Sequence, residues 1–317
     1  MIGIICGALS AVLYTVTNVC LRSLGEVNAI WVSTIKAIPT MVIVLPFVVA
    51  QLRQGTHFQP ANERVSLRGE FWSLGITSIA VQIFGNVAFQ VALSIVGLTI
   101  SVPLVLATML IAGAASGKLM LGEVVSSRKI ASILVLIPAS IILSFSAATA
   151  NVSDAADSNV GMILFGVAAN IAAGITYALQ GTLMRRSMQR GVSAWTTLLL
   201  INSVGVTFLL GWSLWQIGPS AILATPWDQL KIMLLAGVLN ALAFMAMAKS
   251  LQHVSVLYVQ LLNASQAAIS ALAGWMFFSE PITKMIFLGI LLTSVGLVIA
   301  GVKDDATTDK PPSDDKK

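Results

Sequence analysis

Long apolar segments follow one another along most of the chain, and short polar or charged stretches separate them. A helix needs about 20 mostly apolar residues to cross a bilayer. The segments are too long and too uniformly apolar for the strands of a membrane barrel, which alternate over about ten residues. The pattern predicts an all-α integral membrane protein with ten transmembrane helices, over residues 2–21, 29–50, 71–93, 97–117, 128–147, 160–183, 194–215, 229–248, 254–278 and 284–302.

The pattern repeats once along the chain. The fourth expected span runs into a Gly-Glu pair at Glu123, and the ninth runs into a Ser-Glu pair at Glu280. Further counterparts are Tyr14 with Tyr177 and Arg22 with Arg185. Two consecutive copies of a five-span unit enter the membrane in opposite directions, as recurs in secondary transporters. We expect two inverted five-helix repeats around a central cavity, at residues 1–150 and 151–302, and a disordered cytoplasmic tail at 303–317.

Composition supports a membrane protein and excludes other classes. Of the 317 residues 57% are apolar and only 10% are charged, whereas soluble proteins have about 25% charged residues. The net charge of +5 is small and the basic residues are scattered, so the sequence has no basic stripe that would bind nucleic acid. We expect the lipid bilayer and a small-molecule substrate as partners, and no nucleic acid.

Basic residues sort unevenly between the loops. With the N-terminus in the cytoplasm, the cytoplasmic loops and tail hold 14 Lys and Arg residues, and the opposite loops hold 3. Cytoplasmic loops of membrane proteins carry such an excess. We therefore expect both termini in the cytoplasm and the chain in the cell membrane, inner or plasma.

The end of the second half carries a motif of a known family. Residues 278–283 read Phe-Ser-Glu-Pro-Ile-Thr, and glycines recur in the span that follows. Together with the Gly-Glu pair at Glu123, the 5+5 chain resembles the EamA-like transporters of the drug/metabolite transporter superfamily over residues 1–302. Lys36 matches a basic residue usual in the second helix, and Tyr14 departs from the usual Trp-Gly of the first. The resemblance implies a central cavity lined mainly by helices 1, 3, 4, 6, 8 and 9, and it leaves the substrate open among amino acids, other metabolites and drugs.

Lys36 is the one ionisable residue well inside an expected span. It lies about 10 Å below the outer end of its helix, and a charge at such a depth marks a functional candidate. Two interpretations stay open. The ammonium group snorkels to the outer interface, or it faces the cavity as a fixed positive charge that favours an anionic or carboxylate-bearing substrate.

Neutral polar side chains gather in several spans. Gln82, Asn86 and Gln90 follow one another at intervals of four residues and share one face of the third helix. Such a stripe either bonds neighbouring helices or forms a wall of the cavity. Further substrate-binding candidates, with the same two interpretations, are Tyr14, Asn18, Asn170, Tyr177, Gln180, Tyr258, Asn263 and Gln266. Glu123 and Glu280, at opposite faces, are interpreted as helix-end caps or salt bridges, or as gates.

Catalytic, metal-binding and nucleotide-binding motifs are absent from the sequence, and no Asp or Glu lies inside an expected span. We therefore expect no enzyme activity, no cofactor and no metal. The pattern indicates a secondary transporter that moves a small polar metabolite, in the first place an amino acid or related carboxylate, by alternating access. The alternatives are a non-transporting receptor or scaffold and an exporter of hydrophobic drug-like compounds. Small residues on one face of the last helix, Gly289, Thr293 and Gly296, indicate close packing or a homodimer.

Overall fold

The computed structural model describes residues 2–25, 27–58, 67–123, 127–150, 160–263, 266–280 and 282–301. Of these residues 89% are helical, and they form no strand. Among them, Phe58 and Val192 form an isolated antiparallel β-bridge. The all-α class predicted from the sequence is confirmed. The expected tail lies outside the described residues.

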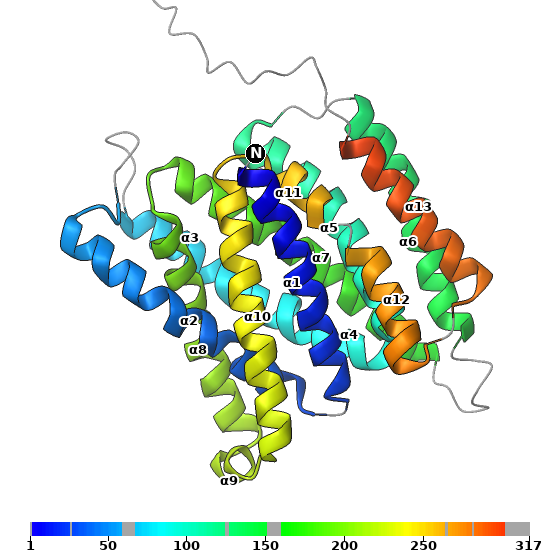
Figure 1. Ribbon diagram of the computed structural model, residues 1–317, viewed down its shortest axis with the longest axis horizontal. Coiled ribbons are helices and arrows are strands. Elements are labelled where there is room, and N and C mark those ends of the chain that lie inside the picture. The colour runs from blue at the N-terminus through cyan, green and yellow to red at the C-terminus, as the bar shows by residue number, and fades with distance from the viewer. Residues whose placement is uncertain are drawn as a thin grey trace, which may run out of the picture.

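Thirteen α-helices and one π-helix make up the described part of the chain (Figure 1). They are α1 (Ile2–Ser23), α2 (Ala29–Gln54), α3 (Leu67–Ala80), η1 (Val81–Val87), α4 (Ala88–Val96), α5 (Leu98–Leu121), α6 (Ser127–Ala150), α7 (Val160–Gln189), α8 (Ala194–Gln216), α9 (Pro219–Leu223), α10 (Trp227–Leu251), α11 (Val256–Asn263), α12 (Gln266–Phe278) and α13 (Lys284–Gly301). The first expected repeat corresponds to α1 to α6, and the second to α7 to α13.

Local sequence signals set the limits of α2. The side-chain oxygen of Asn28 accepts hydrogen bonds from the backbone N–H groups of Ile30 at 3.0 Å and Trp31 at 3.3 Å. These bonds satisfy two of the donors that a helix start leaves free. Gly55 ends the helix with a φ of 67°, a left-handed conformation that glycine adopts without steric cost. The helix therefore runs one turn beyond the end expected at residue 50.

The third expected span departs from α-helical geometry in its middle. It consists of α3, η1 and α4, and η1 is a π-helical segment. π-helical turns are rare and are frequently found at functional sites. Because η1 carries Gln82 and Asn86, the departure falls on the polar stripe predicted for this span.

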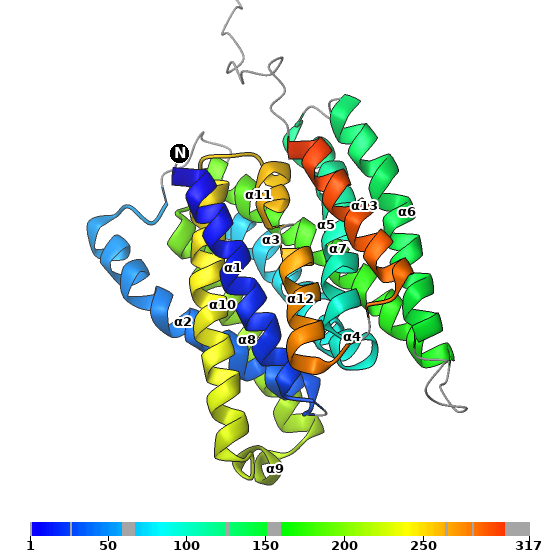
Figure 2. The ribbon, with the colours of Figure 1, turned by 45° about the vertical axis from the view of Figure 1, so that its right-hand side comes forward.

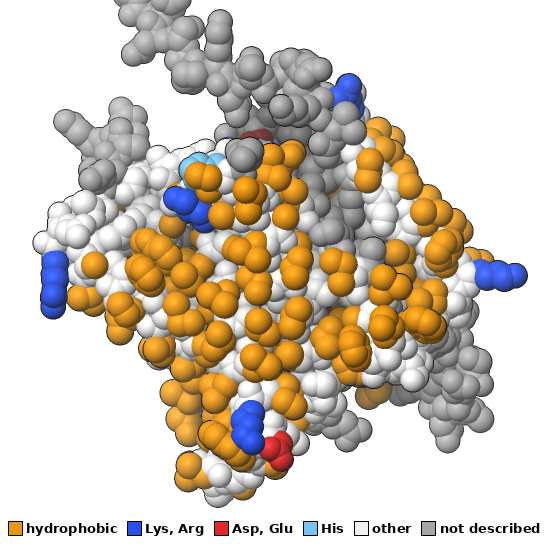
Figure 3. Space-filling model, viewed as in Figure 1, with side chains coloured by type: hydrophobic (Ala, Val, Ile, Leu, Met, Phe, Trp, Pro, Cys, Tyr) orange, Lys and Arg blue, Asp and Glu red, His pale blue; other side chains and the backbone are white. Residues whose placement is uncertain are grey.

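Seven helical units of the described chain are long and apolar enough to cross a membrane. They are α1, α2, the α3–η1–α4 unit, α5, α7, α8 and α10. The other three expected spans coincide with α6, with α13, and with α11 and α12 together. Hydrophobic side chains cover most of the face shown in Figure 3, and its charged side chains lie toward the edges. The chain is an integral membrane protein by these measures, and the count of ten spans stays a prediction.

Helices of the first half pack mainly against helices of the second half. α1 lies along α10, as Figures 1 and 2 both show, and α2 contacts α8 and α10. α5, η1 and α4 all pack on α7, and α5 also contacts α11 and α12. α6 and α13 form a pair at one side of the bundle (Figure 2). The two halves are therefore interlocked, and residues from both face the centre.

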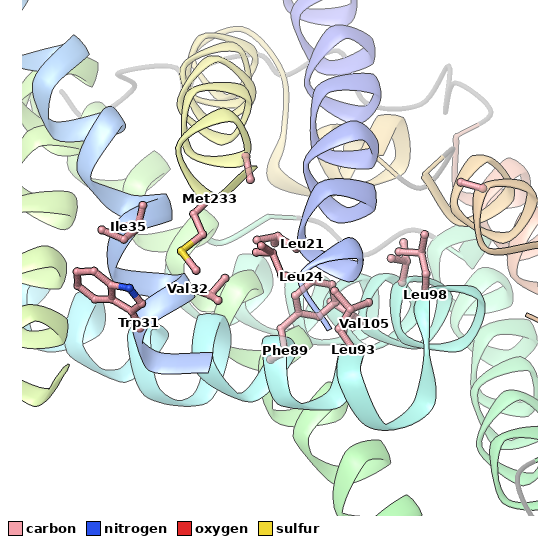
Figure 4. Close-up of a cluster of buried hydrophobic side chains, with 14 of the residues drawn as sticks. Leu21, Leu24, Trp31, Val32, Ile35, Phe89, Leu93, Leu98, Val105 and Met233 are labelled. Carbon is pink, nitrogen blue, oxygen red and sulfur yellow. The ribbon is translucent and has the colours of Figure 1, made fainter. Parts of the chain in front are cut away.

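Buried apolar side chains form clusters near the two ends of the bundle. The cluster near the C-terminal end of α1 is drawn in Figure 4 and includes Leu21, Leu24, Phe89, Leu93 and Val105. The cluster near the C-terminal end of α7 includes Leu183, Met184, Leu198, Phe244 and Val256. In a bilayer these clusters act through close van der Waals packing, since lipid tails are as apolar as leucine.

Candidate functional site

A cavity of about 150 Å³ lies inside the bundle. Its walls come from α1, α2, η1, α4, α5, α7, α8, α10, α11 and α12. Nine of the twelve predicted candidates line it: Tyr14, Asn18, Lys36, Gln82, Asn86, Tyr177, Gln180, Asn263 and Gln266.

Lys36 is buried in the cavity wall, with 6% of its surface exposed. Its Nζ donates a hydrogen bond to Oδ1 of Asn86 at 2.8 Å. The same oxygen accepts a bond from the hydroxyl of Tyr177 at 3.1 Å, and Nδ2 of Asn86 donates to Oε1 of Gln82 at 2.7 Å. The side chain of Lys36 therefore reaches into a network of α2, η1 and α7, and does not snorkel to the interface.

A glycine on the neighbouring helix makes room for this network. A Cβ atom at Gly205 of α8 would lie 2.2 Å from Nε2 of Gln82, closer than any side chain tolerates. The amide of Gln82 thus occupies the space that a side chain at residue 205 would fill. The position of the Gln82 amide against α8 depends on this glycine.

A second polar cluster lies where α1 meets α11 and α12. Oδ1 of Asn263 accepts hydrogen bonds from Oγ of Ser10 at 2.9 Å and from Nε2 of Gln266 at 3.0 Å. Nδ2 of Asn263 donates to the backbone oxygen of Val259 at 2.9 Å. These side chains are buried, and their bonds connect the first helix with both segments of the ninth expected span.

One wall of the cavity is apolar. It consists of one face of α5, because its lining residues follow helical spacing: Val102, Val105, Leu106 and Met109. Phe244 and Met247 of α10 and Ile201 of α8 also line the cavity. The site therefore combines a polar region around Lys36 with an apolar surface.

Three predicted candidates lie away from the cavity lining. Gln90 donates from Nε2 to the backbone oxygen of Leu21 at 3.4 Å, near the end of α1, where carbonyl groups run out of helical partners. Asn170 is fully buried and donates to Oγ of Ser101 at 3.2 Å, which joins α7 to α5. Tyr258 is half-buried in α11. Only two of the three amides in the predicted stripe therefore face the cavity.

Three polar residues that the predicted set does not contain also line the cavity. They are Thr17, Asn202 and Asn240. Asn202 is buried, and its Nδ2 donates to the backbone oxygen of Leu198 at 2.8 Å. A lone amide in an apolar span is itself a signal, because unpaired polar groups are costly in hydrocarbon. A search for stripes misses such isolated residues.

Glu280 joins the two halves of the chain at one end of the bundle. Its Oε1 accepts hydrogen bonds from Nε of Arg22 at 3.0 Å and from the backbone N–H of Leu98 at 2.8 Å, and its Oε2 accepts one from the N–H of Thr99 at 2.7 Å. The carboxylate thus caps the start of α5, a helix of the other half. Gly97 permits this approach, since a Cβ atom there would lie 2.7 Å from Oε1 of Glu280.

Glu123 joins the halves at the other end. Its Oε1 lies 3.5 Å from Nε of Arg185, and this oxygen has no hydrogen-bond partner among the described residues. Arg185 also donates through Nη1 to the backbone oxygen of Val254. Both glutamates therefore form salt bridges.

The two salt bridges lie at opposite ends of α1. Arg22 is in the last turn of this helix. Arg185 bonds Val254, and nearby Ser250 donates to the backbone oxygen of Gly3 at 2.7 Å, in the first turn. A helix of this length measures about 30 Å. The cavity lies between the two ends.

Comparison with known proteins gives a family and a fold. Residues 164–302 match the model of the EamA-like transporter family. A solved structure described only as "Crystal structure of protein" has a TM-score of 0.63 and 13% identity, covering 94% of this chain and 96% of that chain. At this identity the likeness concerns the fold alone. No curated protein matches the chain. The resemblance to EamA-like transporters of the drug/metabolite transporter superfamily, predicted from the sequence, is confirmed for residues 164–302.

Proposed function

We propose that the protein is a secondary transporter that moves a small polar metabolite, an amino acid or related carboxylate, by alternating access between two inverted five-helix repeats. The observation that carries the proposal is a buried cavity in which Lys36 meets amide and tyrosine side chains. Polar groups inside an apolar bundle are costly, and such groups commonly mark a solute path. The family match to transporters supports the same function.

Helix packing supports the inverted repeat. Exchanging each span with its counterpart turns the contact of α1 with α10 into the contact of α7 with the α3–η1–α4 unit, and both contacts occur. The exchange also turns the contact of α5 with α7 into that of α11 and α12 with α1. It leaves the α2–α8 and α6–α13 pairs unchanged. Contacts are exchanged in this way when the two halves are related by a twofold axis.

The two salt bridges support the same relation and suggest gates. Arg22 and Glu280 have Arg185 and Glu123 as their counterparts in the sequence, so the exchange turns one bridge into the other. In an alternating-access carrier, one end is closed while the other opens. We assign Glu280 and Glu123 to gates of the two ends, with the better-bonded Glu280 gate closed in this conformation.

Export of hydrophobic drug-like compounds is a second candidate function, favoured by the apolar face of α5. Lys36 argues against it. A neutral hydrophobic ligand offers nothing to a desolvated ammonium group, which is costly to keep in the membrane. The cationic side chain favours a polar or charged solute.

Counterflow into proteoliposomes tests the proposal. Vesicles that hold purified protein and an unlabelled amino acid or carboxylate should accumulate the labelled compound, and protein-free vesicles should not. Lys36→Ala should lower the initial rate at least about tenfold, because it removes the cation of the site, and should leave the amount of protein in the membrane unchanged. Lys231→Ala is the matched control, since this lysine is exposed at the start of α10. Absence of counterflow with every amino acid, carboxylate and drug-like compound would contradict the proposal.

A further inference from the structure

Every carboxylate among the described residues has a cationic partner of its own. The pairs are Glu280 with Arg22 at 3.0 Å, Glu123 with Arg185 at 3.5 Å, Asp228 with Lys231 at 3.1 Å, and Glu70 with Arg190. None of these residues lines the cavity. Lys36, which does line it, bonds the neutral amide of Asn86. Among the described lining residues, the cavity therefore holds one positive charge and no carboxylate.

Around Lys36, the hydrogen-bond donors outnumber the acceptors that are free to bond them. An ammonium group has three N–H donors, and one of them bonds Asn86. Oδ1 of Asn86 already accepts from Lys36 and Tyr177, and Oε1 of Gln82 accepts from Asn86. A carboxylate, which only accepts hydrogen bonds, complements such a site. An ammonium group of a ligand, which only donates, finds Oδ1 of Asn86 already bonded to two donors and the charge of Lys36 beside it.

The apolar wall adds a second requirement on the ligand. Four residues on one face of α5, from Val102 to Met109, present only hydrocarbon and thioether groups, and Phe244 adds an aromatic ring. A ligand that is polar all round would lose hydration along this wall without gaining hydrogen bonds. A ligand with an aliphatic or aromatic body would fill it.

We infer that the substrate is a monocarboxylate with an apolar body and no cationic group, such as a branched-chain or aromatic 2-oxo acid. This inference rests on the proposed function and narrows it, because it excludes zwitterionic amino acids as the preferred substrates. The carboxylate of such a ligand would give Lys36 the negatively charged partner that the described cavity lining does not provide. A zwitterion also brings an ammonium group into a cavity whose described lining has no carboxylate to receive it.

Ligands that share one hydrocarbon body and differ in charge test the inference. 4-Methyl-2-oxopentanoate, leucine and 3-methylbutylamine form one series, and phenylpyruvate, phenylalanine and phenethylamine form another. Thermal unfolding of the purified protein reports binding, since a ligand of the folded state raises Tm. Each 2-oxo acid should reach its half-maximal effect at a concentration at least about tenfold below that of its amino acid, and the amines should have no effect. An amino acid that matches its 2-oxo acid, or no effect of either 2-oxo acid, overturns the inference.

Asn86→Asp tests the charge argument with almost no change of shape. The new carboxylate would stand at the atom that Nζ of Lys36 contacts at 2.8 Å, so it would neutralise the lysine internally. The half-maximal concentration of the 2-oxo acids should rise at least about tenfold, and their advantage over the amino acids should disappear. Lys36→Arg keeps the charge and should keep the preference. An unchanged preference in Asn86→Asp would overturn the inference even if Lys36 variants fail to fold.

Transport assays separate this inference from the proposed function. Counterflow of labelled leucine that 4-methyl-2-oxopentanoate does not inhibit would leave transport standing and overturn the anion preference. Binding of the 2-oxo acids without counterflow of any compound would support the anion preference and contradict transport. Counterflow of labelled 4-methyl-2-oxopentanoate that leucine inhibits only weakly would support both.

Discussion

Each end of the bundle holds an Arg–Glu pair, but the two glutamates differ in the hydrogen bonds that they accept from the described residues. The carboxylate of Glu280 accepts hydrogen bonds from Arg22 and from two backbone N–H groups at the start of α5. The carboxylate of Glu123 lies 3.5 Å from Arg185, and its Oε1 has no hydrogen-bond partner among the described residues. Repeated motifs therefore do not imply equal interactions, and the Glu280 end is the more firmly fastened one in this conformation.

The groups that face each glutamate account for the difference. Glu280 meets a helix N-terminus, where free N–H groups and the helix dipole attract a carboxylate. At the other end, Arg185 bonds both Glu123 and the backbone oxygen of Val254, two residues before α11. The arginine rather than the glutamate thus holds the segment that leads into α11.

Removal of each carboxylate should show the largest contrast between the ends. Glu280→Ala leaves Arg22 and the start of α5 without their acceptor, and should lower the free energy of unfolding by about 3 kcal/mol. Glu123→Ala removes one long ion pair and should cost about 1 kcal/mol or less. Chemical unfolding of the purified protein in detergent measures both values. Equal losses would show that the extra bonds of Glu280 add nothing.

Two glycines with positive φ angles offer a finer comparison. Gly97 has a φ of 78° and would place a Cβ atom 2.7 Å from Oε1 of Glu280, whereas Gly122 has a φ of 67° and open space around it. Gly122→Ala should cost about 1 kcal/mol through backbone strain alone. Gly97→Ala should cost more, about 2–3 kcal/mol, because its ψ of 174° lies in a region almost restricted to glycine and because the new Cβ atom displaces the carboxylate. If both variants unfold at the same denaturant concentration, the close approach of Glu280 contributes nothing to stability.

A native cysteine reports whether the Glu280 end opens. Cys20 is half-buried in α1 and packs against the apolar cluster of Figure 4. Glu280→Gln should raise the rate at which a water-soluble maleimide labels Cys20 about tenfold, since opening this end costs less without the ionised carboxylate. The assay uses a Cys6→Ser background, and Glu123→Gln is the matched control. An equal increase in both variants would indicate general loosening instead of a gate.

Much of the fold could be predicted because every helix that crosses the bilayer needs about 20 mostly apolar residues. α1 ends two residues beyond its expected range and α8 one residue beyond. The π-helical turn of η1 was not predictable, because it depends on contacts between helices distant in sequence. The room for its Gln82 amide comes from Gly205, on a helix of the other half.

The candidate site could be predicted in residue types more than in orientation. The depth of Lys36 allowed its ammonium group to reach either the interface or the cavity, and the position of Asn86 on η1 decides between them. Gln82 and Gln90 belong to one stripe. Only the packing of the last turn of α1 places Gln90 against the backbone oxygen of Leu21, beyond the cavity lining.

Double-mutant cycles should give the smallest and most specific contrast. For Arg185 and Glu123, the coupling energy from the two alanine variants and their combination should be below about 1 kcal/mol, because a single 3.5 Å contact brings modest Coulomb energy. For Arg22 and Glu280, the coupling should be larger, about 1.5–3 kcal/mol, since the hydrogen bond at 3.0 Å reaches a carboxylate with 9% of its side chain exposed. Salt should reduce both couplings to a similar extent, because the side chains are 25% and 9% exposed in the Arg22–Glu280 pair and 16% and 16% exposed in the Arg185–Glu123 pair. A larger coupling at the Glu123 end would reverse the comparison, and would mean that the end with fewer bonds is the one that holds the bundle closed.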